Sequence, residues 1–534
     1  MPTVFPPGKA TVGVGYGDCA GESAGVGEQG MPGNGRMTQL GKAIEVSHVV
    51  SSVSKAGLLS GRNASVVGGV ARSTEEAGQC PRREGAAQNS LFGESNTAAP
   101  EADRTVSPKL AGLVARARKE ARLTNVIQYV DEELLRLAFR SLRKQAAPGV
   151  DGQSYEDYAA NLDQNLKDLY ARLKSGRYQA PMIRRVYIPK ANGKLRALGI
   201  TTIEDRVVQK AVAWVLSAVF EQDFLNCSHG FRPNRSPHTA LHHLRTGMMQ
   251  HWARYVVEVD VVSYFDSVNW EWLRKFVRHR VNDGGLIRLL NRWLKAGVME
   301  NGVVTLSTGG VPQGGPVSPV LSNIYLHYVL DLWFERRFKK TCQGYAGLTR
   351  FADDFVATFR YHSDARRFRQ EMEERLAAFG LRVAPEKTAL LYFNGDALLE
   401  KERPTRKPDT FVFLGFTHFL AKARSGILTI VLKPSVKARE RFISHARIWL
   451  KLNRHLPVRD QRAHLDKMLN GFYQYFGLRL CCTPLYGVRQ RVRHAWVWAL
   501  KRRSQKAKRR CDWATLNAQP WFQLPVLRVT HAWV

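Results

Sequence analysis

Three aspartates occur in two short segments whose patterns could bring their carboxylates together. Residues 256–266 form an apolar, β-branched run that ends on Asp260 and then turns into a helix. Residues 349–359 alternate as two short strands, with Asp353 and Asp354 at the bend between them. Because adjacent like charges at a hairpin tip are unfavourable unless a cation neutralises them, the pattern predicts a bound cation at this point.

Carboxylates at neighbouring strand ends suit the chemistry of nucleotide transfer. Transfer of a nucleotide to a 3′-hydroxyl uses two divalent ions, one at the attacking oxygen and one at the triphosphate. Mg²⁺ prefers few, rigidly placed carboxylates and keeps its remaining positions for water and phosphate. An Asp-Asp pair can also be an ordinary exposed turn, so the prediction depends on what lies between the two segments.

The intervening residues 310–325 form a turn rich in glycine and proline that enters a helix with apolar periodicity. Glycines permit a close approach of the backbone to a nucleotide or a template base. Gln313 can form a hydrogen bond at the same surface. The alternative is that this turn is only a loop.

The order of the three segments resembles that of polymerase motifs A, B and C of reverse transcriptases, and in detail of those encoded by bacterial group II introns. The resemblance implies an α+β right-hand polymerase with fingers and palm, and two Mg²⁺ ions held at Asp260, Val261, Asp353 and Asp354. The hairpin reads Phe-Ala-Asp-Asp where many relatives carry Tyr, and both acids remain. Phe265 falls where the family keeps an aromatic gate against the ribose 2′-hydroxyl, although such a residue could equally belong to the core.

The basic segment at residues 184–196 resembles the fingers strand and loop that hold the incoming triphosphate in this family. The resemblance implies charge-assisted phosphate contacts from Arg196 and Lys190. Basic hairpins can also line the path of a nucleic acid, and we expect Lys194 to do so.

Three further blocks follow the family order as far as about residue 420. Residues 227–233, which include Arg232, resemble the block near the RNA template. Residues 380–388 resemble motif D, whose Lys387 could protonate the pyrophosphate leaving group. Residues 413–416 resemble the primer-side block that ends the palm.

The charge of the chain is strongly and unevenly basic. Its 80 Lys and Arg against 46 Asp and Glu leave a formal charge of +34, which suits a protein that neutralises many phosphates. Residues 431–510 hold 21 Lys or Arg and three acids, with apolar residues at helical spacing among them. This region resembles the thumb and maturase region of the same family. The resemblance implies RNA binding by Lys501, Arg502, Arg503 and Lys506.

The predicted organisation has three parts. Residues 1–106 contain 18 of the 43 glycines, three aromatic residues and no tryptophan. Such a stretch cannot bury enough apolar area to offset its ordering entropy, which predicts a disordered extension. A folded accessory domain and untranslated upstream sequence are the alternatives. Residues 107–425 are predicted to form the fingers and palm, and residues 426–534 an all-α thumb and maturase domain.

Other classes of protein find little support. The seven cysteines show no C-x-x-C pair and no metal-site spacing, which fits a reduced intracellular protein. The longest strongly apolar run, residues 211–220, is roughly half of what a bilayer needs. Some relatives carry an endonuclease domain rich in Cys and His, and its spacing is absent, so we expect priming to need a nick or a replication fork supplied elsewhere.

Together these features imply an RNA-directed DNA polymerase that binds its parent group II intron RNA as a ribonucleoprotein and assists splicing and target-primed mobility. Its other partners would be an RNA template, a DNA primer or target and deoxynucleotides, in the bacterial cytoplasm and at the nucleoid during mobility. Two alternatives stay open: a host-adopted reverse transcriptase, for instance in phage defence, and a catalytically silent RNA-binding splicing factor. The intact aspartates speak against the second.

Overall fold

The computed structural model describes residues 108–189, 195–300, 303–305, 309–311, 314–395, 407–423 and 425–531, with the backbone alone for Pro189 and Arg196. The predicted N-terminal extension and four predicted site side chains lie outside this part of the chain: Lys190, Lys194, Arg196 and Gln313. No helix among the described residues combines the length and apolar character needed to cross a bilayer.

A four-stranded antiparallel sheet in the order β6-β7-β3-β8 carries the aspartate segments. The strands are β3 (Tyr255–Val259), β6 (Ala346–Phe351), β7 (Asp354–Phe359) and β8 (Ala389–Tyr392). The register pairs Val259 of β3 with Phe355 of β7. One further step along the same register sets Asp260 opposite Asp354, so the fold brings the two motifs to one edge of the sheet.

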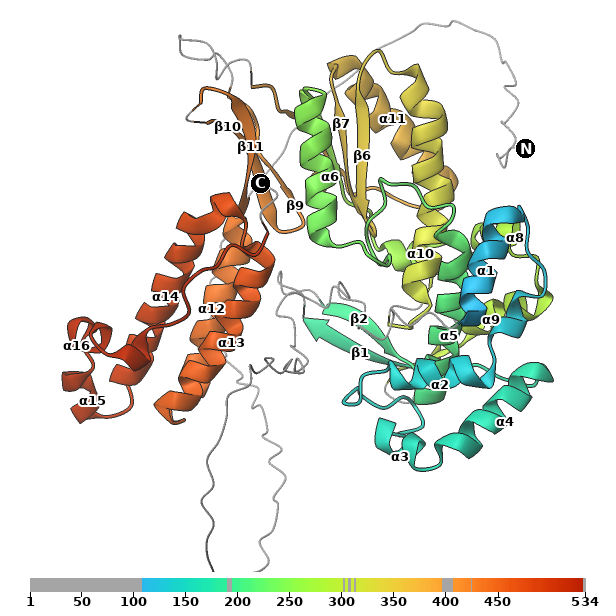
Figure 1. Cartoon of the computed structure of the whole chain (residues 1–534), viewed down its shortest axis with the longest axis horizontal. Coiled ribbons are helices and arrows are strands. Elements are labelled where there is room, and N and C mark those ends of the chain that lie inside the picture. Colours follow the sequence, from blue (N-terminus) through green and yellow to red (C-terminus); the bar gives the residue numbers. More distant parts are fainter. Residues whose placement is uncertain are drawn as a thin grey trace, which may run out of the picture. The chain divides into compact units, whose positions relative to one another are not determined.

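Helices cover both faces of this sheet. Helix α11 (His362–Ala378) packs against β3 and β7, and helix α6 (Pro237–Gln250) packs against β6 (Figure 1). Successive side chains of a strand point to opposite faces, so Val257 joins one hydrophobic cluster with α11 whereas Val256 joins another with α6. Burial on both faces explains why the strand appears in the sequence as a continuous apolar run.

The remaining helices of this region surround the sheet and a long central helix, α5. Helix α5 (Ile203–Phe220) is buried along most of its length, and Thr202 caps it by accepting the Asp205 N–H at 3.2 Å. The others are α1 (Pro108–Lys119), α2 (Glu132–Arg140), α3 (Tyr155–Ala160), α4 (Leu162–Lys174), α7 (Tyr264–Ser267), α8 (Trp270–Arg280), α9 (Gly284–Lys295) and α10 (Ser318–Leu326). Helix α10 continues through π-helical turns at His327–Asp331 and Phe334–Phe338.

The chain forms two smaller sheets besides the central one. The first has the order β2-β1-β4-β5 and the second the order β11-β10-β9. Their strands are β1 (Ile183–Pro189), β2 (Leu195–Ile200), β4 (Val298–Glu300), β5 (Val303–Thr305), β9 (Phe411–Phe413), β10 (Phe416–Lys422) and β11 (Leu428–Pro434). The β1–β2 hairpin contains the predicted triphosphate-binding segment.

The basic C-terminal region is helical, as the spacing of its apolar residues predicts. Its helices are α12 (Val436–Leu452), α13 (Val458–Phe476), α14 (Cys482–Lys501), α15 (Gln505–Arg510) and α16 (Trp513–Asn517). Phe442 and Phe472 pack with ring centroids 4.3 Å apart between α12 and α13. The helices begin later than expected, because the predicted boundary at residue 425 falls inside the β10–β11 hairpin. The all-α prediction for residues 426–534 is therefore wrong for β11.

A buried ion pair fixes the hairpin that carries Asp353 and Asp354. The side chains of Arg350 on β6 and Asp331 are both 0% exposed. Arg350 Nε and Nη2 donate to the two Asp331 carboxylate oxygens at 2.8 and 2.6 Å. The other guanidinium hydrogens go to Ser228 Oγ at 2.7 Å, Asn323 Oδ1 at 3.1 Å and the Ala352 carbonyl at 2.9 Å. All five N–H donors of the guanidinium are therefore satisfied.

Removing one partner of this pair should destabilise the protein strongly. Asp331→Ala leaves a buried guanidinium without its counter-charge, and we expect a loss of about 3–5 kcal/mol in the free energy of unfolding, measured by urea denaturation. The control is Glu335→Ala, which breaks an exposed pair with Lys339 on the adjoining turn. It should cost at most about 0.5 kcal/mol. Equal losses in the two variants would contradict the structural role of the buried pair.

Candidate active site

The three predicted aspartates lie at one end of the central sheet. Asp260 follows the last residue of β3, Asp354 is the first residue of β7, and Asp353 belongs to the tight turn between β6 and β7. The strand pattern of the sequence therefore corresponds to a real convergence of these acids. They come from segments almost a hundred residues apart, and antiparallel pairing brings them together.

The turn that carries Asp353 is held by the block at residues 227–233. The His229 N–H donates to the Arg350 carbonyl, and the Arg350 N–H donates to the Cys227 carbonyl, each at 2.8 Å. Gly230 comes so close that a Cβ atom there would lie 2.3 Å from the Ala352 nitrogen. Ala352 itself has a φ of 58°, a left-handed conformation that is uncommon outside glycine. These contacts fix a strained turn at the position where the acids are needed.

Repulsion among acids dominates the electrostatics of the site. The pKa of Asp354 is raised to about 7, by desolvation first and then by the charges of Asp353, Asp260 and Glu258. Because Asp354 is exposed to solvent, we give the like charges more weight than desolvation. The pKa of Glu258 is raised to about 6, by desolvation first and then by Asp260. Sequence analysis missed Glu258, although its position two residues before Asp260 put it on the same face of the strand.

Lys387 provides the positive charge beside these acids. Its Nζ donates to Asp260 Oδ2 at 2.5 Å, and this hydrogen bond is the main cause of its raised pKa. The backbone places it there, because the Ala384 N–H donates to the Asp260 carbonyl at 2.9 Å and Val261 forms a bridge with Val383. The motif D segment is therefore joined to motif A, and Lys387 keeps its proton at this site.

The glycine-rich turn before α10 packs against the helix that follows Asp260. The Val311 N–H donates to the Phe265 carbonyl at 2.7 Å. Gly310 has a φ of 81°, and a Cβ atom there would lie 2.9 Å from the Asp266 backbone. A Cβ atom at Gly314 would lie 2.1 Å from the Gly199 carbonyl oxygen. These two glycines are thus needed for contacts between protein backbones, whereas the sequence suggested contact with a nucleotide.

The donor chemistry of the site fits a hard divalent cation. Asp260, Asp353 and Asp354 offer carboxylate oxygens, and the raised pKa of Asp354 shows a charge balance that a cation would relieve. Val261 is buried and its side chain is a hydrocarbon without a ligand atom, so this residue could contribute only its carbonyl oxygen. In the part of the chain that the structure describes, no three His, Cys, Asp or Glu residues are gathered closely enough to form a ready metal site.

The predicted RNA-binding residues have different surroundings. Arg232 is an internal residue, since its side chain is 5% exposed and bonds to Glu221 and to the carbonyls of Leu225 and Ser228. The structure thus contradicts the expected contact between Arg232 and RNA. The predicted RNA-binding residues of the C-terminal region lie at the end of α14 and in α15. Lys501 is half-buried, whereas Arg502, Arg503 and Lys506 are exposed.

The raised pKa of Asp354 predicts that, without added metal, the stability of the protein depends on pH. Its ordinary pKa is 3.8 and its folded pKa is about 7, so the ionised form opposes folding increasingly between these values and fully above pH 7. Asp354→Asn removes this penalty. The melting temperature of the variant should exceed that of the wild type by an amount that grows from about pH 5 to about pH 7 and then levels off. Added Mg²⁺ should reduce this difference in melting temperature. A difference that does not change with pH would contradict the raised pKa of Asp354 as its cause.

Comparison with known proteins agrees with this geometry. Residues 188–418 match the family described as Reverse transcriptase (RNA-dependent DNA polymerase). Protein YkfC of Escherichia coli is 35% identical over 323 residues, which are 55% of this chain and 81% of that protein.

Proteins named for introns also match. The group II intron-encoded protein LtrA of Lactococcus lactis is 39% identical over 175 residues, which are 32% of this chain and 29% of LtrA. The putative COX1/OXI3 intron 1 protein of Saccharomyces cerevisiae is 30% identical over 214 residues, or 40% of this chain and 25% of that protein. The chain thus aligns with less than a third of each intron protein. These matches and the arrangement of motifs A to D show that the chain belongs to the group II intron-encoded reverse transcriptases and maturases.

Proposed function

We propose that the chain extends a DNA primer on an RNA template at the aspartate site, and that its C-terminal helices bind the parent group II intron RNA to assist splicing and mobility. The observation that carries the catalytic part is the meeting of Asp260 and Asp354 at the ends of paired strands. Desolvation and then the charges of Asp353, Asp260 and Glu258 raise the pKa of Asp354 there. The family relationship supports both parts.

The aspartates and the Val261 carbonyl oxygen would hold two Mg²⁺ ions. When bound, these ions supply activation of the primer 3′-hydroxyl and neutralisation of the triphosphate. The protein contributes positioning, because Arg350 and Gly230 hold the hairpin turn and backbone pairing holds Asp260. Fixed carboxylates need no reorganisation when charge develops in the reaction.

Lys387 is suited to act as the acid for the leaving group. The hydrogen bond to Asp260 raises its pKa, so the side chain carries a proton throughout the neutral range. Release of this ammonium from Asp260 would leave a proton donor beside the triphosphate. Its side chain is 61% exposed, so it has room to move toward a bound pyrophosphate.

Phe265 would exclude the 2′-hydroxyl of a ribonucleotide. It is half-buried in the short helix α7, directly after the Asp260 segment. Its ring meets that of Tyr264 edge-on with centroids 5.3 Å apart. Tyr264 is in turn buried and donates to the Ser322 carbonyl at 3.0 Å. The support beneath Phe265 is therefore rigid, as a steric gate requires.

The end of α14 combines cations with exposed aromatic surface. The Arg502 guanidinium lies 3.8 Å from the centroid of the Trp498 ring, and Trp498 is 47% exposed. Arg503 donates to the Leu456 carbonyl at 2.5 Å, so it fixes α14 to the loop after α12. Aromatic rings can stack on unpaired bases while cations follow the phosphates. This supports RNA binding by Arg502 and Lys506, with a positioning role for Arg503.

Catalysis and assistance of splicing should be separable by mutation. The double variant Asp353→Ala with Asp354→Ala should lose extension of a DNA primer on a generic RNA template with Mg²⁺ and deoxynucleotides, because the metal ligands are gone. The same variant should still promote splicing of a transcript that contains the intron encoding this protein, at Mg²⁺ concentrations too low for the RNA alone. Extension by the double variant would refute the site, and no splicing with either protein would refute the maturase role.

Phe265→Val should relax discrimination between deoxynucleotides and ribonucleotides. Removal of the ring opens space for the 2′-hydroxyl, and we expect the ratio of kcat/KM for dTTP over UTP to fall by about a hundredfold. Phe265→Tyr keeps the ring and serves as the matched control, with discrimination close to wild type. An unchanged ratio in Phe265→Val would show that Phe265 is a core residue and not a gate.

A further inference from the structure

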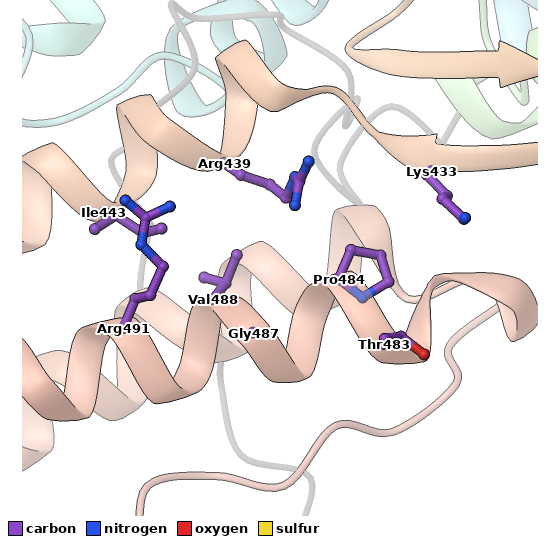
Figure 2. A pocket seen from close by; sticks show the side chains of 8 residues that line it. All are labelled: Lys433, Arg439, Ile443, Thr483, Pro484, Gly487, Val488 and Arg491. Carbon is purple, nitrogen blue, oxygen red and sulfur yellow. The ribbon is translucent and has the colours of Figure 1, made fainter.

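A cavity of about 410 Å³ is lined by residues of β11, α12 and α14, none of which belongs to the aspartate site (Figure 2). Cationic side chains reach it from three separate elements: Lys433 from β11, Arg439 from α12 and Arg491 from α14. The other residues that line it are neutral: Ile443, Thr483, Pro484, Gly487 and Val488. Glu440 pairs with Arg491 from outside the lining, and the excess of positive charge that remains predicts an anionic ligand.

The hydrogen-bonding state of the cations leaves capacity for such a ligand. Arg439 Nε is buried and makes no hydrogen bond within the described protein. Arg491 is already paired, because both its Nη atoms donate to the Glu440 carboxylate, Nη2 at 2.8 Å, so Lys433 and Arg439 provide the uncompensated charge. Lys433 Nζ lies 4.6 Å from the centroid of the Phe419 ring. A buried guanidinium N–H without a partner is costly, and a phosphate oxygen would satisfy it.

The N-terminal end of α14 lies at the cavity and adds partial positive charge that favours an anion. Thr483 and Pro484 belong to the first turn of this 20-residue helix and line the cavity. The N-cap residue, Cys481, forms no side-chain cap hydrogen bond. The N-terminal end of a helix carries partial positive charge and unsatisfied N–H groups, which favour a phosphate.

The size and the apolar wall indicate more than a phosphate ion. Cavities that bind small organic ligands measure about 300–1,000 Å³ and are mostly apolar with a few polar groups. Ile443 of α12 and Val488 of α14 form the apolar part of the lining (Figure 2), where little of either side chain is exposed. A base or ribose could rest against this wall while the cations hold the phosphate.

We propose that this cavity binds a single nucleotide of an RNA strand, with its phosphate at Lys433, Arg439 and Arg491 and its base against Ile443 and Val488. The proposal rests on the proposed RNA binding by the C-terminal helices and gives it a defined site. Thr483 offers a hydroxyl beside the ribose, which can donate to or accept from a 2′-hydroxyl. If the proposal is correct, filling the cavity should weaken RNA binding even when no charge is changed, which would not be expected for a merely basic surface.

Gly487 allows that distinction to be tested. A Cβ atom at Gly487 would meet no atom within 4 Å, so Gly487→Leu can fill the cavity without changing any charge. Leucine also favours the helix over glycine, so the fold should be retained. Gly112 in α1 has equally open space, and Gly112→Leu is the matched control. Arg439→Gln removes one cation, and Arg441→Gln on the exposed side of α12 removes the same charge outside the cavity.

The full-length protein would be titrated against a fluorescein-labelled single-stranded oligoribonucleotide, with fluorescence anisotropy as the readout. Gly487→Leu and Arg439→Gln should each weaken binding about tenfold, whereas Gly112→Leu and Arg441→Gln should stay within about twofold of wild type. The salt dependence of log Kd should become less steep by about 0.7 for Arg439→Gln and stay unchanged for Gly487→Leu. AMP should compete for the wild-type protein better than inorganic phosphate does.

The outcomes separate this inference from the function on which it rests. Wild-type affinity in Gly487→Leu would overturn the nucleotide cavity and leave RNA binding by the region intact. Equal competition by phosphate and AMP would also overturn it, since the apolar wall would then contribute nothing. Absence of binding by the wild type would overturn both proposals. Primer extension by Gly487→Leu on a generic template shows that the polymerase remains folded.

Discussion

The polymerase site depends on the buried ion pair between Arg350 and Asp331. Burying two charges is costly, and this pair tolerates burial because every guanidinium N–H is satisfied. Its bonds join four segments: the β6–β7 hairpin, the turn at Asp331, the α10 helix at Asn323 and the strand-like block at Ser228. The position of Asp353 and Asp354 is therefore set by polar contacts beneath the hairpin, and the acids need no contact with each other.

The aspartate site that the Arg350–Asp331 pair supports carries an excess of negative charge. Desolvation and then the neighbouring acids raise the pKa values of Asp354 and Glu258, while Lys387 pairs with Asp260. Folding energy from the core therefore maintains an arrangement that is unfavourable by itself. Such an arrangement is useful where a cation must bind, because the repulsion is relieved upon binding.

Positive charge is distributed differently over the rest of the chain. Some arginines in the polymerase region are buried and stabilise the fold by internal hydrogen bonds, as Arg232 and Arg350 do. In the C-terminal helices many cations are exposed, and three cations from β11, α12 and α14 line the cavity. A count of Lys and Arg cannot separate these two uses, because only burial distinguishes a structural cation from one available to phosphate.

The sequence by itself determined the strands and the turn that carry the aspartates, the helical C-terminal region and the family, because strand periodicity and motif order are local properties. Tertiary structure decided what depends on distant partners. It showed that Arg232 is buried, that Gly310 and Gly314 pack against protein backbone, that β11 precedes the C-terminal helices, and that Glu258 joins the acids. The cavity at Arg439 was equally hidden, since its cations come from three elements that only folding places together.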